Sequence, residues 1–424
     1  ASHGSIPITS NKGGLPETNL NGFILKHNSS EKLYKLLIKL LSNTKKLDNL
    51  SRKVYKNFNF TNKRFLKSVS KVRYKNEKIK KVFLISNLNI KNKERLFYSF
   101  FNKINLGLKR YPFKLASVSD RDFIRDNRGL LDLSGKKSFN NTILRTVKLF
   151  NPDLIILGHT DRISIKTFEK IRTIKKDIKI IKIFIDSISD EFFKFKNAFY
   201  DYKYLNNIFI SSDPYKLKKH DLSSKVKFIP YPVEKKIDSL KAFNVINKEI
   251  DIFFALSHGQ NRRTLKPGKK DEREPFLKKI KTLLPANINS QFIGMDNRQP
   301  LWGYKFYNTI KNSKILINLS RGKYKKHYSS DRISTLIGNG CFVLNEEKNK
   351  YSDFFNNKNE LINFKNAEDL KNKILYYLTR PKLRNKIASN CYKKYHYSMN
   401  TKKIINYILD VVFDKEIKKK YLWT

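Results

Sequence analysis

The sequence is poor in cysteine, in acidic residues and in long apolar runs, and each shortage argues against a class of protein. Cys341 and Cys391 are the only cysteines among 424 residues, which favours a reducing compartment over a disulfide framework or a cysteine metal site. The seven histidines show no HxxxH or HExxH spacing, so no metal centre is predicted. Apolar runs such as LIIL are far shorter than the roughly twenty residues of a spanning helix. We expect a protein of the cytoplasm, or of the inner face of the cytoplasmic membrane, that needs no cofactor.

Positive charge is abundant: 89 Lys and Arg face 37 Asp and Glu, for a formal net charge of +52. One interpretation is an anionic partner, such as nucleic acid, an acidic membrane face or a phosphorylated substrate. The other is a plain solvated surface, since the charge is mostly Lys and is spread over the whole chain. A nucleic-acid groove needs charge gathered on one face. We therefore favour the plain surface, with attraction to anionic membrane lipid and without a nucleic-acid partner.

Short β-branched runs alternate with longer amphipathic stretches from about residue 80 onward. Apolar runs of this length between helices indicate parallel sheets covered on both faces, and IPYPVEKK indicates a hinge. The sequence therefore predicts an α/β fold of two doubly wound Rossmann-like domains, residues 80–233 and 234–405, with a closing helix over 406–424. The predicted strands cover 81–86, 153–158, 178–186, 206–212, 225–233, 249–257, 289–295, 313–320 and 340–347.

An internal repeat links the two ends of the chain. Gly4 and Gly340, 336 positions apart (340 − 4 = 336), each precede an apolar strand, a polar turn, a Leu-rich helix and a Lys/Leu helix. We therefore expect residues 1–75 to be the tail of an upstream domain of the same kind. Because such a tail lacks the strands with which its own should pair, it is expected to be marginally stable or to depend on its neighbours.

Two stretches resemble known glycosyltransferases. GSIPITSNKGGLPET…NGFIL resembles the end of the nucleotide-sugar-binding domain of group 1 glycosyltransferases, where a small-Gly-x-Pro-hydrophobic strand precedes GGxxE. The segment from FYNTIKNSKILINLSRG to LYYLTRPKLRNKIASNCYKKYHY resembles the C-terminal half of spore-maturation-protein-like glycosyltransferases. Residues 80–235 agree only in general layout. The resemblance implies a GT-B fold, two Rossmann-like domains facing a cleft, and a nucleotide-diphosphate-sugar donor.

Donor-binding groups are predicted after two strands of the second domain. Ligands of open α/β sheets lie beyond the carboxyl ends of the strands, and a pyrophosphate favours helix N-termini. Glycine lets the backbone approach a phosphate, and Arg can bind it bidentately. An ordinary turn with exposed Arg and a plain Ser-Ser-Asp N-cap explain the same residues equally well. The predicted donor-binding residues are Ser257, Gly259, Arg263, Arg321, Lys323, Ser329, Ser330 and Arg332.

One position departs from the related families. They commonly place a Glu in the helix before the glycine-containing strand, where it binds the donor ribose. Counting back from Gly340, that position is Thr335. A hydroxyl holds a diol less strongly than a carboxylate does. Thr335 is therefore the predicted but weaker ribose-binding residue, with Glu346, Glu347 and Asp353 as alternatives.

Two residues of the first domain are predicted to act in catalysis. LIILGHTDR places His159 just past a strand end, and IFIDSISDE does the same for Asp186. An inverting transferase needs a base that takes the proton of the acceptor hydroxyl, whereas a retaining one does without it. A lone His is more often structural. We predict His159 as the base, with Asp186 as the second choice.

The preferred hypothesis is a metal-independent GT-B glycosyltransferase that acts on a saccharide or lipid-linked acceptor in surface-glycan synthesis. Catalysis would rest on positioning and on stabilising the leaving diphosphate. Two alternatives stay open: a non-enzymatic basic module that binds nucleic acid or an acidic polymer, and a degenerate GT-B domain that binds glycans. The donor sugar, the stereochemical outcome and the oligomeric state are not predicted.

Overall fold

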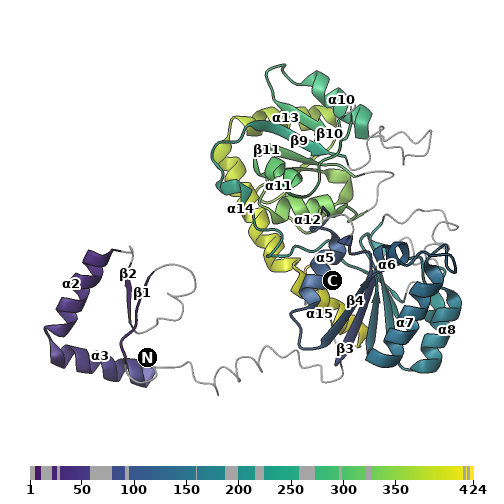
Figure 1. Ribbon diagram of the computed structural model, residues 1–424. Helices are drawn as coiled ribbons and strands as arrows, with labels where there is room; N and C mark the ends of the chain where they lie inside the picture. Colours follow the sequence, from purple (N-terminus) through teal and green to yellow (C-terminus); the bar gives the residue numbers. More distant parts are fainter. Residues whose placement is uncertain are drawn as a thin grey trace. The chain divides into compact units, whose positions relative to one another are not determined.

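The chain divides into unit 1, Ala1–Asn76, and unit 2, Glu77–Thr424 (Figure 1). Each unit is described by itself. A computed structural model describes residues 5–10, 22–25, 29–57, 79–90, 95–158, 160–186, 199–214, 224–256, 273–295, 298–320, 326–413, 417 and 421–424. Among these residues no helix is both long enough and apolar enough to cross a membrane.

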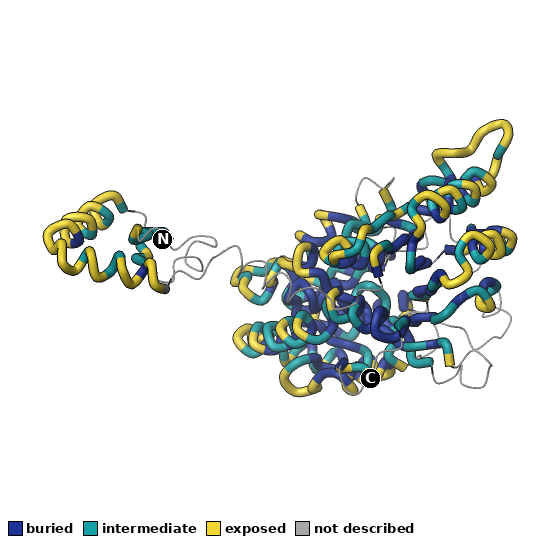
Figure 2. The backbone as a smooth tube through the Cα atoms, turned by 90° about the horizontal axis from the view of Figure 1, so that it is seen from below, coloured by how far each residue is buried: buried dark blue, intermediate teal, exposed yellow. Residues whose placement is uncertain are grey.

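Unit 1 is a pair of parallel strands followed by two helices. The side chain of Ser29 accepts a hydrogen bond from the backbone N–H of Lys32 and caps the first helix, which satisfies one of the free donors at its start. Within residues 5–57, only Leu40 and Val54 are buried among the described side chains, and Figure 2 shows the two helices as largely exposed. The elements are β1 (Ile8–Ser10), β2 (Phe23–Leu25), α2 (Ser30–Leu41) and α3 (Thr44–Asn57).

The N-terminal lobe of unit 2 contains a six-stranded parallel sheet in the order β4-β3-β5-β6-β7-β8. The chain runs from β3 outward to β4 and then to β5 on the other side of β3, so the topological switch point lies between β3 and β5. The strands are β3 (Lys81–Ser86), β4 (Lys114–Ser119), β5 (Leu154–Leu157), β6 (Lys179–Phe184), β7 (Asn207–Ile210) and β8 (Val226–Phe228), and the helices are α5 (Phe100–Leu108), α6 (Asp120–Asp126), α7 (Lys136–Phe150) and α8 (Ile165–Ile174).

The C-terminal lobe contains a five-stranded parallel sheet in the order β10-β9-β11-β12-β13, with its switch point between β9 and β11. Neighbouring residues of β11 enter two different apolar clusters, as with Ile315 and Leu316, because successive side chains of a strand point to opposite faces. The strands are β9 (Ile250–Ala255), β10 (Ser290–Ile293), β11 (Ser313–Asn318), β12 (Val343–Glu346) and β13 (Ile362–Phe364), and the helices are α10 (Arg273–Leu283), α11 (Gly303–Lys311), α12 (Asp331–Gly338), α13 (Ala367–Leu378), α14 (Pro381–Ser398) and α15 (Thr401–Val412).

The last helix, α15, packs against the N-terminal lobe. The Tyr111 hydroxyl, after α5, donates to Asn406 Oδ1 at 2.6 Å. A Cβ at Gly107 of α5 would lie 2.7 Å from Ile405 Cδ1, so this glycine permits the close approach. The helix begins at Thr401 rather than at the expected boundary of 406, because Asn400 caps it by accepting from Lys403 N. The chain therefore crosses between the lobes at the end of α14.

The expected hinge is packed rather than exposed. Val233 N donates to Met399 O and Thr401 N donates to Val233 O, at 3.0 Å each. Tyr395 of α14 donates its hydroxyl hydrogen to Tyr231 O at 2.9 Å. The segment IPYPVEKK is thereby held against the junction between α14 and α15.

Some elements differ from the sequence prediction. The amphipathic stretch after β3 becomes helical only from Phe100, where α5 begins after a turn in which Ser99 N donates to Leu96 O. Strand β4, with the alternating sequence KLASVS, was not predicted, and neither were β13, α6 and α7. The two doubly wound lobes themselves are as predicted.

Unit 1 repeats the end of the C-terminal lobe in its element order. Its four elements β1, β2, α2 and α3 correspond to β12, β13, α13 and α14, and both strand pairs are parallel. The first paired residues, Ile8 and Leu344, are 336 positions apart (344 − 8 = 336), and α2 and α13 each have 12 residues. The repeat is thus present in the structure. Membership of a longer tandem protein stays a prediction.

Candidate functional site

The first turns of two helices meet between the lobes of unit 2. Phe100 opens α5, which follows β3, and Asp331 opens α12, which follows β11. The backbone N–H of Phe100 donates to Asp331 Oδ2 at 3.3 Å. A helix that follows a parallel strand starts at the carboxyl edge of the sheet. The carboxyl edges of the two sheets therefore face each other, which is where an open α/β sheet binds its ligands.

Arg332 spans the switch point of the C-terminal lobe. Its Nη1 donates to Leu319 O, just past β11, at 2.9 Å, and its Nη2 donates to Ala255 O, at the end of β9, at 3.2 Å. The guanidinium also lies 4.5 Å from the centre of the Phe254 ring. Ser330 caps α12 by accepting from Arg332 N. The sequence thus places a cation and a capped helix N-terminus between β9 and β11, where a phosphate would be favoured.

A row of asparagines on three neighbouring strands positions the start of α12. Asn318, Asn345 and Asn363 are register partners on β11, β12 and β13, and all three are buried. Asn318 Nδ2 donates to Asn345 Oδ1 at 2.9 Å, and Asn345 Nδ2 donates to Asn363 Oδ1 at 2.6 Å. Asn318 also exchanges hydrogen bonds with the Ser329 hydroxyl. Buried amides that satisfy one another fix a single arrangement, so Ser329 serves to position the start of α12.

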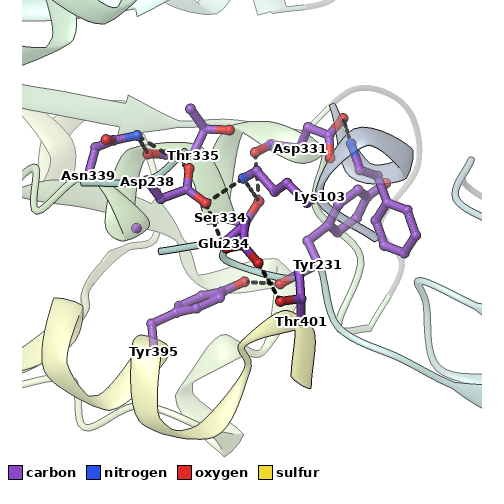
Figure 3. A network of polar contacts seen from close by, with 12 residues as sticks. Lys103, Tyr231, Glu234, Asp238, Asp331, Ser334, Thr335, Asn339, Tyr395 and Thr401 are labelled. Atoms are coloured by element: carbon purple, nitrogen blue, oxygen red, sulfur yellow. Dashed lines mark hydrogen bonds and ion pairs between the residues drawn. The ribbon is translucent and has the colours of Figure 1, made fainter. Parts of the chain in front are cut away.

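A buried ionic network joins the lobes beside this site (Figure 3). Lys103 of α5 and Asp238 are both fully buried and form an ion pair of 2.9 Å. Lys103 Nζ also donates to Ser334 Oγ of α12 at 3.4 Å. Burial raises the pKa of Asp331 to about 6, although Lys103 and the N–H of Phe100 oppose the shift, and Asp186 adds to it. The start of α12 thus carries a carboxyl group that titrates near neutrality.

Comparisons with known proteins agree with this geometry. Residues 269–410 match the family described as glycosyl transferase-like. An alpha-glucosyltransferase, in complex with UDP and a 13-mer DNA with a central A:G mismatch, is 13% identical, with a TM-score of 0.52 over 78% of this chain and 99% of that one. HepE of Anabaena, in complex with UDP and glucose, is 12% identical, with a TM-score of 0.50 over 79% of this chain and 100% of that one. Unit 2 has the GT-B glycosyltransferase fold.

No curated protein matches the sequence. The GT-B fold confirms the predicted architecture of two facing Rossmann-like lobes and the resemblance from which it was inferred. Because the sequence identities to these two structures are so low, the similarity shows the fold alone. The roles of individual residues must therefore come from the geometry of this chain.

The N-terminal lobe of the GT-B fold brings three buried polar side chains to its own switch point. Ser86 ends β3, Asp120 follows β4, and Thr160 follows β5. All three residues are at most 3% exposed. Within the described ranges, Ser86 Oγ has no hydrogen-bond partner, and Asp120 Oδ2 and Thr160 Oγ1 have none apart from the contact between the Thr160 hydroxyl and the Asp120 carboxylate. A Cβ at Gly158 would lie 2.1 Å from Ser86 Oγ, so the ends of β3 and β5 are closely packed.

Asp120 is the acid of this group. Burial raises its pKa, while the nearby Thr160 hydroxyl and the N–H of Arg121 act in the opposite direction. A buried polar atom without a partner costs about 1–3 kcal/mol, and such atoms at strand ends are typical of sites that bind something. We refer to Ser86, Asp120 and Thr160 as the switch-point triad.

Four of the predicted site residues can be placed around α12 and one near it. Ser330 and Arg332 lie at the start of α12, and Ser329 is held by Asn318 as described. Thr335 is 1% exposed, and its hydroxyl has no partner among the described residues. Asp186 is exposed after β6, and its charge reaches Asp331 of the other lobe. The structure therefore brings this acid near the start of α12, and its role in catalysis stays a prediction.

The remaining predicted residues lie outside the described residues. They are His159, Ser257, Gly259, Arg263, Arg321 and Lys323. Of the alternatives for the ribose, Asp353 pairs with His327 at 2.9 Å. Glu346 ends β12, accepts a hydrogen bond from Ser320 N, and has a pKa raised by burial. Glu346 and Glu347, which follows it, thus lie at the carboxyl edge of the sheet.

Sequence reasoning missed Lys103, the asparagine row and the switch-point triad. Lys103 sits in an ordinary-looking amphipathic stretch, and no sequence signal marks it as buried. The triad had a weak signal, because Asp120 follows KLASVS, but that strand was itself not predicted. The asparagines were hidden by the high Asn content of the whole chain.

Proposed function

We propose that the chain transfers a sugar from a uridine-diphosphate sugar to a saccharide or lipid-linked acceptor. The observation that carries the proposal is the contact between Phe100 N and Asp331 Oδ2, which sets the two switch points opposite each other. The glycosyl transferase-like match over residues 269–410 supports it. The alpha-glucosyltransferase and HepE hold UDP, and HepE also holds UDP-glucose, so UDP-glucose is the first donor to test.

The donor diphosphate is proposed to lie at the start of α12. The positive end of the helix favours an anion, and Ser330 orders this turn by accepting from Arg332 N. Arg332 sets the electrostatic field at the switch point, since its guanidinium bridges β9 and β11. Arg321, Lys323, Ser257, Gly259 and Arg263 remain predicted phosphate ligands. For the ribose we propose Glu346, because it ends β12 at the carboxyl edge of the sheet and a carboxylate holds a diol more strongly than the Thr335 hydroxyl does.

The acceptor is proposed to bind at the N-terminal lobe. Asp120 sits at the switch point of that lobe, and burial raises its pKa, which makes its carboxylate a stronger base than an exposed one. It would accept the proton of the acceptor hydroxyl as the new glycosidic bond forms and the nucleoside diphosphate leaves. His159 and Asp186 stay proposals for the same step.

Several finer features of the proposal rest on sequence reasoning alone. We propose that the diphosphate leaves without a metal ion, stabilised by Arg, Lys and helix N-termini. The cytoplasmic location, the loose association with anionic membrane and the role in surface-glycan synthesis are proposed from composition and from the resemblance.

Calorimetric titration of the full chain with UDP, followed by measurement of UDP release from UDP-glucose, tests the proposal. We expect saturable UDP binding that Arg321→Ala weakens at least about tenfold, as loss of one charge-assisted contact implies. The exposed Arg128→Ala is the matched control and should bind UDP normally. Asp120→Asn should lower kcat by about a hundredfold and leave UDP affinity unchanged. Absence of UDP binding at millimolar concentration would refute the proposal.

A further inference from the structure

A cavity of about 570 Å³ opens in the N-terminal lobe between α7 and α8, two helices that lie side by side (Figure 1). Its lining comes from the first turns of both helices and from the segment before α8. Helix α8 follows β5 directly, so its first turn lies at the carboxyl edge of the sheet. That is the edge to which the acceptor is assigned. A cavity of this size is typical of sites for small ligands.

Among the described residues, five cationic side chains and one carboxylate line this cavity. Asp161 is the carboxylate, and it already pairs with Arg162 at 3.0 Å and with Arg121 at 3.7 Å. No described acid lies within ion-pair distance of the four lysines. They belong to the first turns of α7 and α8 and to the turn after, namely Lys136, Lys137, Lys166 and Lys170.

The position of these lysines is electrostatically unfavourable in the empty protein. A helix N-terminus carries partial positive charge and favours acidic side chains. The first turns of α7 and α8 contain no acidic residue, unlike those of α10, α12 and α13. The Asp132 carboxylate, before α7, already accepts a hydrogen bond from Ser138 N, but the four exposed lysines have no such acid among the described residues. An anion in the hollow would be attracted by these lysines and by both helix starts.

The wall of the cavity is held rigidly by one amide. Asn140 Oδ1 accepts from Ser164 N at 2.9 Å and from Thr167 Oγ1 at 2.7 Å. Its Nδ2 donates to Lys136 O and Arg162 O. One side chain of α7 therefore fixes the start of α8 and the segment before it. The backbone that carries the cations is thus fixed before any ligand arrives.

The shape favours a sugar-sized ligand over a nucleic acid. Tyr200 is the aromatic residue in the lining, and its hydroxyl donates to Ile163 O at 2.5 Å. A single-strand groove uses a series of stacking aromatic side chains along an extended cationic track. Here a few cations converge on one hollow instead, as in a site for a single anionic group.

We propose that this cavity binds an anionic group of the acceptor, a phosphate or carboxylate carried by a saccharide. The proposal rests on the proposed function, because it names the acceptor class of the same reaction. Its site is separate from the donor site at α12. The acceptor is thus held by charge in the N-terminal lobe while its hydroxyl is presented at the switch point.

Titration of the full chain with glucose 6-phosphate, glucose and inorganic phosphate, followed by calorimetry near physiological salt, tests the proposal. We expect glucose 6-phosphate to bind, glucose not to bind, and inorganic phosphate to bind more weakly than glucose 6-phosphate. The double variant Lys136→Gln, Lys166→Gln should weaken glucose 6-phosphate binding at least about tenfold. The control Lys148→Gln, Lys176→Gln removes the same charge at exposed positions outside the cavity and should leave binding unchanged.

Three outcomes would overturn the proposal. If the control pair weakens glucose 6-phosphate binding equally, the effect comes from overall charge and not from this cavity. If inorganic phosphate binds as tightly as glucose 6-phosphate, the cavity does not recognise a saccharide. Tighter binding of a short single-stranded DNA that is lost in the same double variant would assign the cavity to nucleic acid. UDP titration of the same variants separates this proposal from the proposed function. A failure of UDP binding in the wild type refutes the function, whereas glucose 6-phosphate binding reports on the cavity alone.

Discussion

The same four-element pattern occurs twice in this chain, once alone and once inside a complete sheet. In the C-terminal lobe, Leu370 and Ile374 of α13 and Cys391 and Tyr395 of α14 are buried. In unit 1, Leu37, Ile38 and Leu41 of the corresponding helix are 39%, 50% and 62% exposed. Figure 2 shows the contrast as yellow helices in unit 1 against a dark blue interior in unit 2.

The contrast teaches which properties are local. Strand pairing and the length and capping of the first helix are alike in both copies, so they follow from short-range sequence. Burial differs because β12 pairs with β11 on its other side, and the complete sheet gives α13 and α14 a surface to cover. Most helix stability in proteins comes from such packing. Unit 1 has the secondary structure of the repeat without most of its apolar burial.

The largest expected difference between the copies is in amide hydrogen exchange. Amides of α13 and α14 should exchange at least about a thousandfold more slowly than those of α2 and α3, because only the former open with the whole lobe. Mass spectrometry of the full chain after timed deuteration measures this. Equal protection in α2 and α3 would show that unit 1 buries its apolar face in solution, and would break the comparison.

A pair of matched truncations sharpens the same contrast. Ile374 and Leu37 occupy the same position counted from the starts of α13 and α2, and Ile374 is fully buried. Ile374→Ala should lower the free energy of unfolding of unit 2 by about 2–5 kcal/mol through the cavity it leaves. Leu37→Ala should change the stability of unit 1 by no more than about 0.5 kcal/mol. Exchange protection within each helix reports both, and similar losses would contradict the assignment of burial.

Charge burial adds a pH dependence that is specific to unit 2. The pKa of Asp331 is about 6 in the folded protein, against an ordinary value of 3.8. Between these values the folded state binds more protons than the unfolded state, so its stability falls as pH rises. Relative to the Asp331→Asn variant, the free energy of unfolding of wild-type unit 2 should fall by about 1.5 kcal/mol between pH 5 and pH 7.5. Urea unfolding at both pH values measures it, and parallel pH curves for the two proteins would contradict the shifted pKa.

The smallest expected effect is one that the copies should share. Ser29 and Asn366 cap α2 and α13 through the N–H of Lys32 and Asp369. Replacing either by Ala should destabilise its own helix by about 1 kcal/mol. Fraying of the first turn, followed by exchange of its amides, is the readout. A much larger effect in α13 than in α2 would mean that the cap acts through packing rather than locally.

The fold could be predicted because its strands have a strong signal. Contiguous apolar runs such as LIIL and KVFLIS become strands that are buried on both faces, and helices form in the amphipathic stretches that alternate with such runs. Strand β4 was not predicted, because KLASVS is only partly buried and lacks a contiguous apolar run. Helix α5 began late because a turn at Leu96–Ser99 interrupts the amphipathic pattern.

The site could be predicted only in part, because its parts are joined by tertiary contacts. The start of α12 was found from the order of strand, loop and serines. Lys103 was not found, since its burial depends on Asp238, far along the chain. The switch-point triad likewise gathers three strand ends that are distant in sequence. Such contacts have no signature in any one stretch.

The most direct test of the central claim is a crystal structure of the full chain soaked with UDP. The account predicts density for the diphosphate within about 3.2 Å of the backbone N–H groups at the start of α12, next to Ser330 and facing α5. Density for the diphosphate elsewhere, or an unoccupied α12 start at saturating UDP, would contradict it.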